Sequence, residues 1–265
     1  MKVGLALVLV ALGLCGRTAT FSDDEIWTQF SGWVEQLKAL PPGERVQFKN
    51  RFVKDMAAAD VDEQEAGRRF ERASVLRRAS TDRERVCWNG AFKCGGGPDA
   101  PLQLLQKTVR SITPGRALDA GMGRGRNTIF LASLGWDVTG YDMAADALKV
   151  AQAAAEAARV KIQTMEARHD TFQFGESQWD LIVCSYCYML LDDNQWPKLF
   201  LKALRPGGVV VFQSATGSRQ TAAMQAERWK GFRLLRFADL DAGMVETDWV
   251  PSKTNPTGML VARKE

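Results

Sequence analysis

The sequence predicts an α/β fold: a doubly wound, mostly parallel sheet of Rossmann-like architecture, preceded by an N-terminal helical extension. Three observations indicate this fold. Strand and helix patterns alternate over residues 116–213, a glycine-rich turn at 121–125 follows the first strand, and the second strand ends at an acid, Asp142. Such alternation is typical of a parallel sheet with helices on both faces. Ligands of these sheets bind beyond the carboxyl ends of the strands.

The composition is that of an ordinary globular protein. The chain has 265 residues, of which 46% are apolar and 25% charged. This length suits one large domain or one domain with an extension. The composition argues against a disordered chain, collagen or a polytopic membrane protein. The net charge of +4 is too small to indicate a nucleic-acid partner by itself.

Residues 1–20 are predicted to be a signal-like or anchor segment. Lys2 precedes an uncharged run at 3–16, which is shorter than the ~20 apolar residues of a membrane-spanning helix. A basic start, a short apolar core and a polar end at 17–20 are typical of a secretory signal. The alternative is a buried or interfacial segment. We therefore expect export, or membrane association through residues 3–16.

Residues 21–95 are predicted to form the helical extension. Ser22 to Glu25 is a capping box, and apolar residues on one face continue that helix to residue 40. Further helices are expected at 48–56 and 62–78. Seven arginines lie between residues 68 and 85: Arg68, Arg69, Arg72, Arg77, Arg78, Arg83 and Arg85.

The arginine segment has two interpretations. It could contact RNA or anionic lipid, or it could be a solvated helix face with ion pairs such as Arg78 with Asp82. Acidic residues are interleaved with the arginines and no series of aromatic residues accompanies them. Both facts favour the solvated face and disfavour a nucleic-acid partner.

Residues 96–265 are predicted to form the sheet domain. Strands are expected at 116–120, 136–141, 160–165, 179–184 and 208–213, with helices at 126–134, 144–159 and 194–204 and a turn at 206–208. Short strand patterns at 234–237, 245–249 and 259–263 predict an antiparallel hairpin at one edge.

The turn after the first strand predicts a nucleoside site. Residues 119–125 read DAGMGRG, and a dinucleotide-binding loop would need a third glycine at position 126, where this chain has arginine. Amide groups at the start of the following helix can donate to a ligand. Asp142 can accept both hydroxyls of a ribose that carries no 2′-phosphate. His169 and Asp170 follow the third strand, where a polar residue can meet an adenine edge.

Residues 118–142, 179–183 and 204–212 carry a resemblance to a known family. About residues 110–215 resemble a class I S-adenosylmethionine-dependent methyltransferase, and 118–142 is similar to the first motif of the branch with tellurite-resistance and thiopurine methyltransferases. The resemblance implies S-adenosylmethionine as cofactor and a sheet of seven strands with the last antiparallel. Residues 21–85 have no counterpart in it.

The resemblance also implies roles for single residues. The three loop glycines would border the methionine part of the cofactor, Asp119 would lie near its amino group, Asp142 would hold the ribose, and Asp170 with His169 would lie near the adenine. The whole expected cofactor set is Asp119, Gly121, Gly123, Gly125, Asn127, Asp142, Met143, His169, Asp170 and Cys184.

The acceptor is expected to meet the residues after the fourth strand. Tyr186 and Tyr188, with Trp88, are the predicted substrate pocket, although a tyrosine could instead fill the interface between sheet and helix. The Asn/Asp-Pro-Pro-aromatic motif of enzymes acting on adenine or glutamine amides is absent here. A small-molecule acceptor is therefore favoured. The spacing of Cys184-x-x-Cys187 with Cys87 and Cys94 does not fit a metal site, so none is predicted.

The predicted function is in-line methyl transfer from S-adenosylmethionine to a small molecule. No catalytic residue is predicted, because alignment of an activated methyl group needs little acid–base chemistry. The alternatives are a non-catalytic nucleoside-binding protein of the same fold and an RNA methyltransferase that uses the arginine segment. The leader indicates export or inner-membrane anchoring, whereas the supply of cofactor indicates a domain that faces the cytoplasm.

Overall fold

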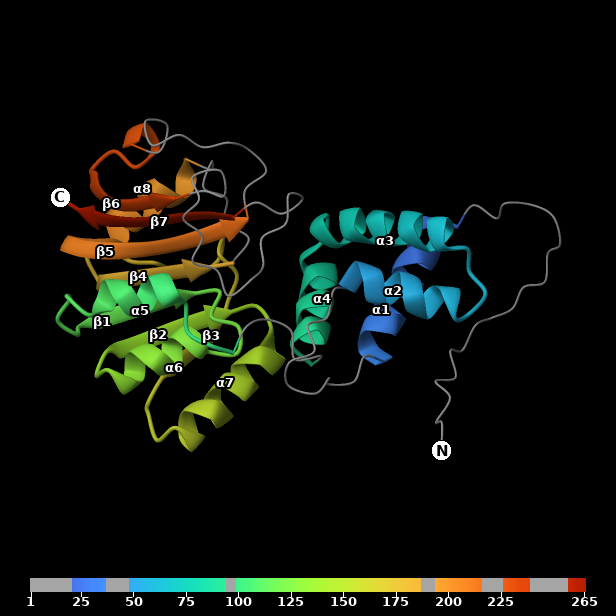
Figure 1. Cartoon of the computed structure of the whole chain (residues 1–265), viewed down its shortest axis with the longest axis horizontal. Helices are drawn as coiled ribbons and strands as arrows, with labels where there is room; N and C mark the ends of the chain where they lie inside the picture. Colours follow the sequence, from blue (N-terminus) through green and yellow to red (C-terminus); the bar gives the residue numbers. More distant parts are fainter. Residues whose placement is uncertain (1–20, 37–47, 94–98, 187–193, 216–225, 239–256) are drawn as a thin grey trace. The chain divides into compact units, whose positions relative to one another are not determined.

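The computed structural model describes residues 21–36, 48–93, 99–186, 194–215, 226–238 and 257–265. The chain divides into two compact units, residues 1–96 and 97–265, which Figure 1 draws in colours that follow the sequence. The predicted leader, the predicted strand at 245–249 and Tyr188 lie outside the described residues. No helix in the described ranges combines the length and apolar character that a membrane span requires.

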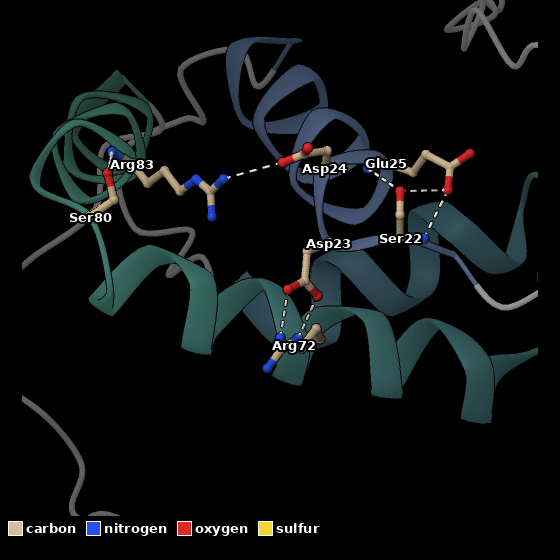
Figure 2. Close-up of polar contacts among 7 residues, drawn as sticks. All are labelled: Ser22, Asp23, Asp24, Glu25, Arg72, Ser80 and Arg83. Carbon is tan, nitrogen blue, oxygen red and sulfur yellow. Dashed lines mark hydrogen bonds and ion pairs between the residues drawn. The ribbon is translucent and has the colours of Figure 1, made fainter.

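The first unit is helical in its described residues. Its helices are α1 (Asp23–Gln36), α2 (Phe48–Ala57), α3 (Glu63–Arg78) and α4 (Thr81–Lys93). The capping box forms as predicted: Ser22 N donates to Glu25 Oε2 at 2.8 Å, and Glu25 N donates to Ser22 Oγ at 3.3 Å (Figure 2). Helix α4 was not predicted from the sequence.

An aromatic cluster forms the core of the first unit. The ring of Phe30 lies 5.7 Å from that of Phe52 and 5.8 Å from those of Trp33 and Phe70, measured between centroids. Trp33 and Phe52 meet edge to face at 5.1 Å. Since buried aromatic side chains dominate core energetics, these contacts hold α1, α2 and α3 together.

Most arginines of the segment 68–85 pair with carboxylates of the same unit. Arg72 binds both oxygens of Asp23 at 2.6 and 2.7 Å, and Arg83 reaches Asp24 at 3.5 Å (Figure 2). Three more pairs are Arg68 with Glu65, Arg69 with Glu65, and Arg85 with Asp82. These pairs agree with the ion-pair interpretation, and Arg69 differs from the solvated face expected there because it is buried.

The expected pair of Arg78 with Asp82 was wrong. Helix α3 ends at Arg78 and α4 begins at Thr81. The two residues therefore do not share one helix, which the i,i+4 geometry requires. Asp82 instead pairs with Arg85 within α4.

The second unit is a mixed sheet with helices on both faces. Its elements are α5 (Gln103–Val109), β1 (Arg116–Ala120), α6 (Arg126–Ser133), β2 (Asp137–Asp142), α7 (Ala145–Ala157), β3 (Gln163–Glu166), β4 (Trp179–Ser185), α8 (Gln195–Ala203), β5 (Leu204–Ala215), β6 (Phe232–Ala238) and β7 (Thr257–Lys264). In the described residues the strand order is β3-β2-β1-β4-β5-β7-β6, and β7 runs antiparallel to both neighbours. The predicted fold class is confirmed.

Two apolar layers cover the sheet, one on each face. On one face Leu105 of α5 and Leu131 of α6 pack on Val183 and Val211. On the other face Phe200 of α8 packs on alternate residues of the same strands. The register aligns Ala120 of β1 with Cys184 of β4, and Cys184 with Phe212 of β5. The carboxyl ends of the parallel strands thus meet at one edge.

The predicted turn at 206–208 lies inside a strand. β5 already begins at Leu204, which pairs with Trp179, and the register then shifts so that Leu181 pairs with Val209. The residues of the expected turn are the extra residues of β5 at this register shift, and Gly207 among them has a φ of 77°. A bulge of this kind places extra residues in one strand without ending its pairing.

Candidate functional site

The glycine loop joins β1 to α6 in a backbone shape that favours glycine. Gly121, Gly123 and Gly125 have φ angles of 70°, 54° and 82°, a region that side chains with a Cβ seldom adopt. Any Cβ at Gly125 would also lie 2.8 Å from the Cβ of Ala151 in α7. Met122 N donates to the carbonyl of Tyr141 at 2.9 Å, so the loop is tied to the end of β2.

Asp142 closes the loop from the end of β2. Its side chain is buried, with Oδ2 accepting from Gly123 N and Oδ1 from Ala144 N, both at 2.9 Å. Burial raises the pKa of Asp142, against the effect of these backbone hydrogen bonds. Each carboxylate oxygen has a further lone pair, so Asp142 can also accept from two hydroxyls. Met143, partly buried, follows directly.

Asp119 lies buried beneath the loop. It is 1% exposed and accepts from Thr128 Oγ1 of α6 at 2.7 Å. Burial raises the pKa of Asp119 to about 6, although the Thr128 hydroxyl and the charge of Arg126 act in the opposite direction. An ammonium group beside this carboxyl would favour its ionised form. Thr128 was missed from the sequence, where only its place in the first turn of the helix could have indicated it.

Tyr141 and His169 form a polar pair on the face of the sheet that α8 covers. Tyr141 Oη and His169 Nδ1 lie 2.8 Å apart. Burial lowers the pKa of His169 to about 4 and raises that of Tyr141, so the hydrogen bond joins two neutral groups. In the tautomer in which Nδ1 accepts from Tyr141 Oη, the ring proton is on Nε2, where it can donate to a ring nitrogen of a purine.

Some predicted residues do not join this group. The carboxylate of Asp170 is exposed and pairs with Arg168 at 2.8 Å. Asn127 is buried and accepts from Leu102 N at 2.9 Å through Oδ1, which fixes the start of α5. Cys184 is fully buried in the apolar layer of α8 and is disulfide-bonded.

The acceptor residues are described only in part. Trp88 belongs to α4 of the first unit and Tyr188 lies outside the described residues, so both stay predictions. Tyr186 follows β4 with a φ of 56°. Its N donates to the carbonyl of Gln213 at 2.8 Å, and its Oη accepts from Gln213 Nε2 at 2.7 Å. Gln213 was missed, although a polar residue ending the apolar run of β5 is a usable signal.

Arg126 connects the loop helix to the end of β4. Its Nη2 donates to Ser185 Oγ at 3.1 Å and its Nη1 to the carbonyl of Ala100 at 2.7 Å. In the sequence this arginine only argued against a dinucleotide loop. The structure gives it a positioning role between the segment before α5 and the strand ends.

The donor and acceptor set fits S-adenosylmethionine. Asp142 offers acceptors for two ribose hydroxyls, and Met143 and Ala144 follow it where an arginine would favour a 2′-phosphate. Asp119 is a buried carboxyl that accepts from the Thr128 hydroxyl and is suited to an amino group. His169 offers a neutral imidazole, which in the tautomer protonated on Nε2 can donate to a purine.

Comparison with known proteins agrees with this geometry. Residues 117–208 match the family described as "Methyltransferase domain". The probable S-adenosyl-L-methionine-dependent methyltransferase TehB of Haemophilus influenzae is 30% identical over 91 residues, 34% of this chain and 32% of that protein. The ubiquinone biosynthesis O-methyltransferase of Bordetella avium is 28% identical over 115 residues, 43% of this chain and 48% of that protein.

A solved structure shows the same fold. The crystal structure of TehB from Haemophilus influenzae aligns with a TM-score of 0.52 and 20% identity, covering 66% of this chain and 65% of that one. The chain spans about a third to a half of the length of the curated relatives named above. Residues 117–208 therefore form a methyltransferase domain, similar to that of the probable S-adenosyl-L-methionine-dependent methyltransferase TehB, and its cofactor is S-adenosylmethionine.

Proposed function

We propose that this protein transfers a methyl group from S-adenosylmethionine to a small-molecule acceptor. The observation that carries the proposal is the loop of three left-handed glycines closed by Asp142, with Asp119 buried behind it. When bound, S-adenosylmethionine supplies a methyl group already activated by its sulfonium. The chain's task is then to bind and align the reactants, and alignment can contribute ~7–11 kcal/mol.

Two facts support a small molecule rather than RNA. The arginines that could have contacted RNA are largely paired with carboxylates of their own unit. One similar protein is named as an O-methyltransferase of ubiquinone biosynthesis. An RNA methyltransferase would predict strong, salt-dependent RNA binding, and its absence at low salt would reject that alternative.

The first test is cofactor binding by the full chain. Thermal unfolding and titration calorimetry would be measured with S-adenosylmethionine, S-adenosylhomocysteine and NAD. A ligand at 100 times its dissociation constant stabilises the folded state by ~2.7 kcal/mol. We expect both adenosyl compounds, and not NAD, to raise the unfolding temperature.

A matched pair of variants makes this test specific. Asp142→Ala removes the carboxylate at the carboxyl end of β2, and we expect it to abolish the shift. Asp137→Ala removes an exposed carboxylate at the amino end of the same strand, where it accepts from Gln163 at 3.1 Å, and should leave the shift intact. Equal shifts in both variants would contradict the assigned role of Asp142.

Turnover separates an enzyme from a nucleoside-binding protein. The assay would follow release of S-adenosylhomocysteine in the presence of phenols, amines and thiols. Cofactor binding without turnover of any acceptor would favour the non-catalytic alternative.

The compartment is also part of the proposal. We propose that the domain faces the cytoplasm, where the cofactor is made, and that residues 3–16 attach it to the membrane. Cell fractionation and sequencing of the mature N-terminus would test this, and a cleaved leader with periplasmic protein would reject it.

A further inference from the structure

The side-chain amide of Gln213 is buried and only half satisfied. Gln213 lies near the carboxyl end of β5 and has no exposed surface. Its Nε2 donates to Tyr186 Oη at 2.7 Å. Its Oε1 is buried and has no hydrogen-bond donor within the part of the chain that the structure describes. Native proteins leave few buried polar atoms without a partner, because each one costs free energy.

The position of Gln213 connects it to the cofactor loop. Alternation along β5 puts Gln213 on the same face as Val209 and Val211, the face that α5 and α6 cover. Gln213 pairs with Ser185 of β4, and Ser185 accepts from Arg126 at the start of α6. The unpaired oxygen therefore lies on the face, and at the strand ends, from which the glycine loop departs.

The backbone of Tyr186, which contacts Gln213, is strained. Tyr186 has a φ of 56°, which a bulky residue adopts only when its surroundings force it. Its backbone N–H donates to the Gln213 carbonyl at 2.8 Å, and its hydroxyl receives the Gln213 amide. Gln213 thus fixes both the main chain and the side chain of a predicted acceptor residue. Strain beside an unpaired buried atom is typical of ligand sites.

We propose that Gln213 Oε1 accepts a hydrogen bond from the methyl acceptor, which therefore carries a hydroxyl or an amine N–H at that point. The inference rests on the proposed function and adds the chemical class of the acceptor and a residue that selects it. A molecule that fills the same space without a donor leaves Oε1 buried and unpaired, and such sites reject it.

The test uses matched pairs of small probes on the full chain saturated with S-adenosylhomocysteine. Catechol is compared with 1,2-dimethoxybenzene, and aniline with N,N-dimethylaniline, within a fragment panel followed by ligand-observed NMR. For fragments that bind, we expect the donor form to bind about tenfold more tightly than its methylated partner, the effect of about one hydrogen bond.

Variants assign this preference to Gln213. Gln213→Met keeps the volume and removes the amide; we expect it to lose the preference for donors, to keep its affinity for S-adenosylhomocysteine and to unfold at the same or a higher temperature. Tyr186→Phe removes the group that orients the amide and should weaken the preference. Gln173→Met, at an exposed glutamine, is the control and should behave as wild type.

Distinct outcomes would overturn the inference. It fails if Gln213→Met unfolds at a clearly lower temperature while the preference for donors persists, since Gln213 would then only support the fold. It also fails if no fragment in the panel depends on Gln213. Failure of the wild type to bind S-adenosylhomocysteine would instead remove the proposed function itself, and the inference with it.

Discussion

The two units of this chain shift the pKa values of their carboxyl groups in opposite directions. In the helical unit, hydrogen bonds from Arg72 and Arg69 hold the pKa of Asp23 and Glu65 below their ordinary values. In the sheet unit, burial raises the pKa of Asp119 and Asp142 at the strand ends. Carboxylates paired with arginines stabilise a fold, whereas buried carboxyls with raised pKa values are typical of functional sites.

The same contrast appears in the glycines. In the helical unit Gly90 serves packing, because a Cβ there would lie 2.0 Å from Val34 Cγ1. In the sheet unit Gly121 and Gly123 serve backbone conformation, with φ angles of 70° and 54°. Helix packing in the first unit and a left-handed backbone in the second thus select glycine for different reasons.

The largest effect is expected from the aromatic core of the helical unit. Phe52 is 1% exposed and contacts Phe30, Trp33 and Phe70. Phe52→Ala should lower the free energy of unfolding of that unit by about 3–5 kcal/mol, measured by chemical denaturation. Binding of S-adenosylhomocysteine, measured by calorimetry, should persist, since the residues assigned to it belong to 97–265. A loss of affinity for S-adenosylhomocysteine in this variant would show that cofactor binding also depends on the helical unit.

The next effect concerns pH and Asp119. Its pKa of about 6 in the folded state lies above its ordinary value of 3.8, so the folded state binds more protons between these values. Its contribution to stability is present below about pH 4 and is lost as the pH rises through 6, on the order of 3 kcal/mol in all. Asp119→Asn keeps an acceptor for Thr128 and should remove this loss, seen as a stability difference from wild type that grows between pH 4 and 7.

His169 provides a control, because its contribution to stability changes with pH in the opposite direction. Its pKa of about 4 lies below the ordinary 6.5, so its contribution is present above pH 6.5 and is lost as the pH falls towards 4. His169→Asn should therefore differ from wild type with the reverse slope over the same range. Parallel slopes for the two variants would contradict the assigned burial of one of these groups.

The smallest effect compares two glycines inside helices of the first unit. Gly90→Ala in α4 should destabilise by about 1–3 kcal/mol through overpacking against Val34. Gly67→Ala in α3 meets no atom within 4 Å and should stabilise by about 1 kcal/mol, because alanine is the better helix former. Thermal unfolding of the two variants checks the signs, and two stabilising substitutions would refute the close crossing of α1 and α4.

Local patterns in the sequence predicted the parts of the fold that depend on neighbouring residues. The capping box at Ser22, the glycine loop and the acid ending β2 each occupy a short stretch, and each appears in the structure as expected. Helices α4 and α5 were not predicted, since α5 is only seven residues long and the charged residues of α4 obscure its apolar face.

The sequence by itself determined the alternation of strands and helices, the glycine loop and the acid at the end of β2, because periodicity and turn chemistry act over a few residues. Only the tertiary structure decided which distant groups meet. Arg72 reaches Asp23 across 49 positions, and Gln213 meets Tyr186 across 27. The raised pKa of Asp119 and the unpaired oxygen of Gln213 likewise arise from burial, which strand register and helix packing create and no local pattern encodes.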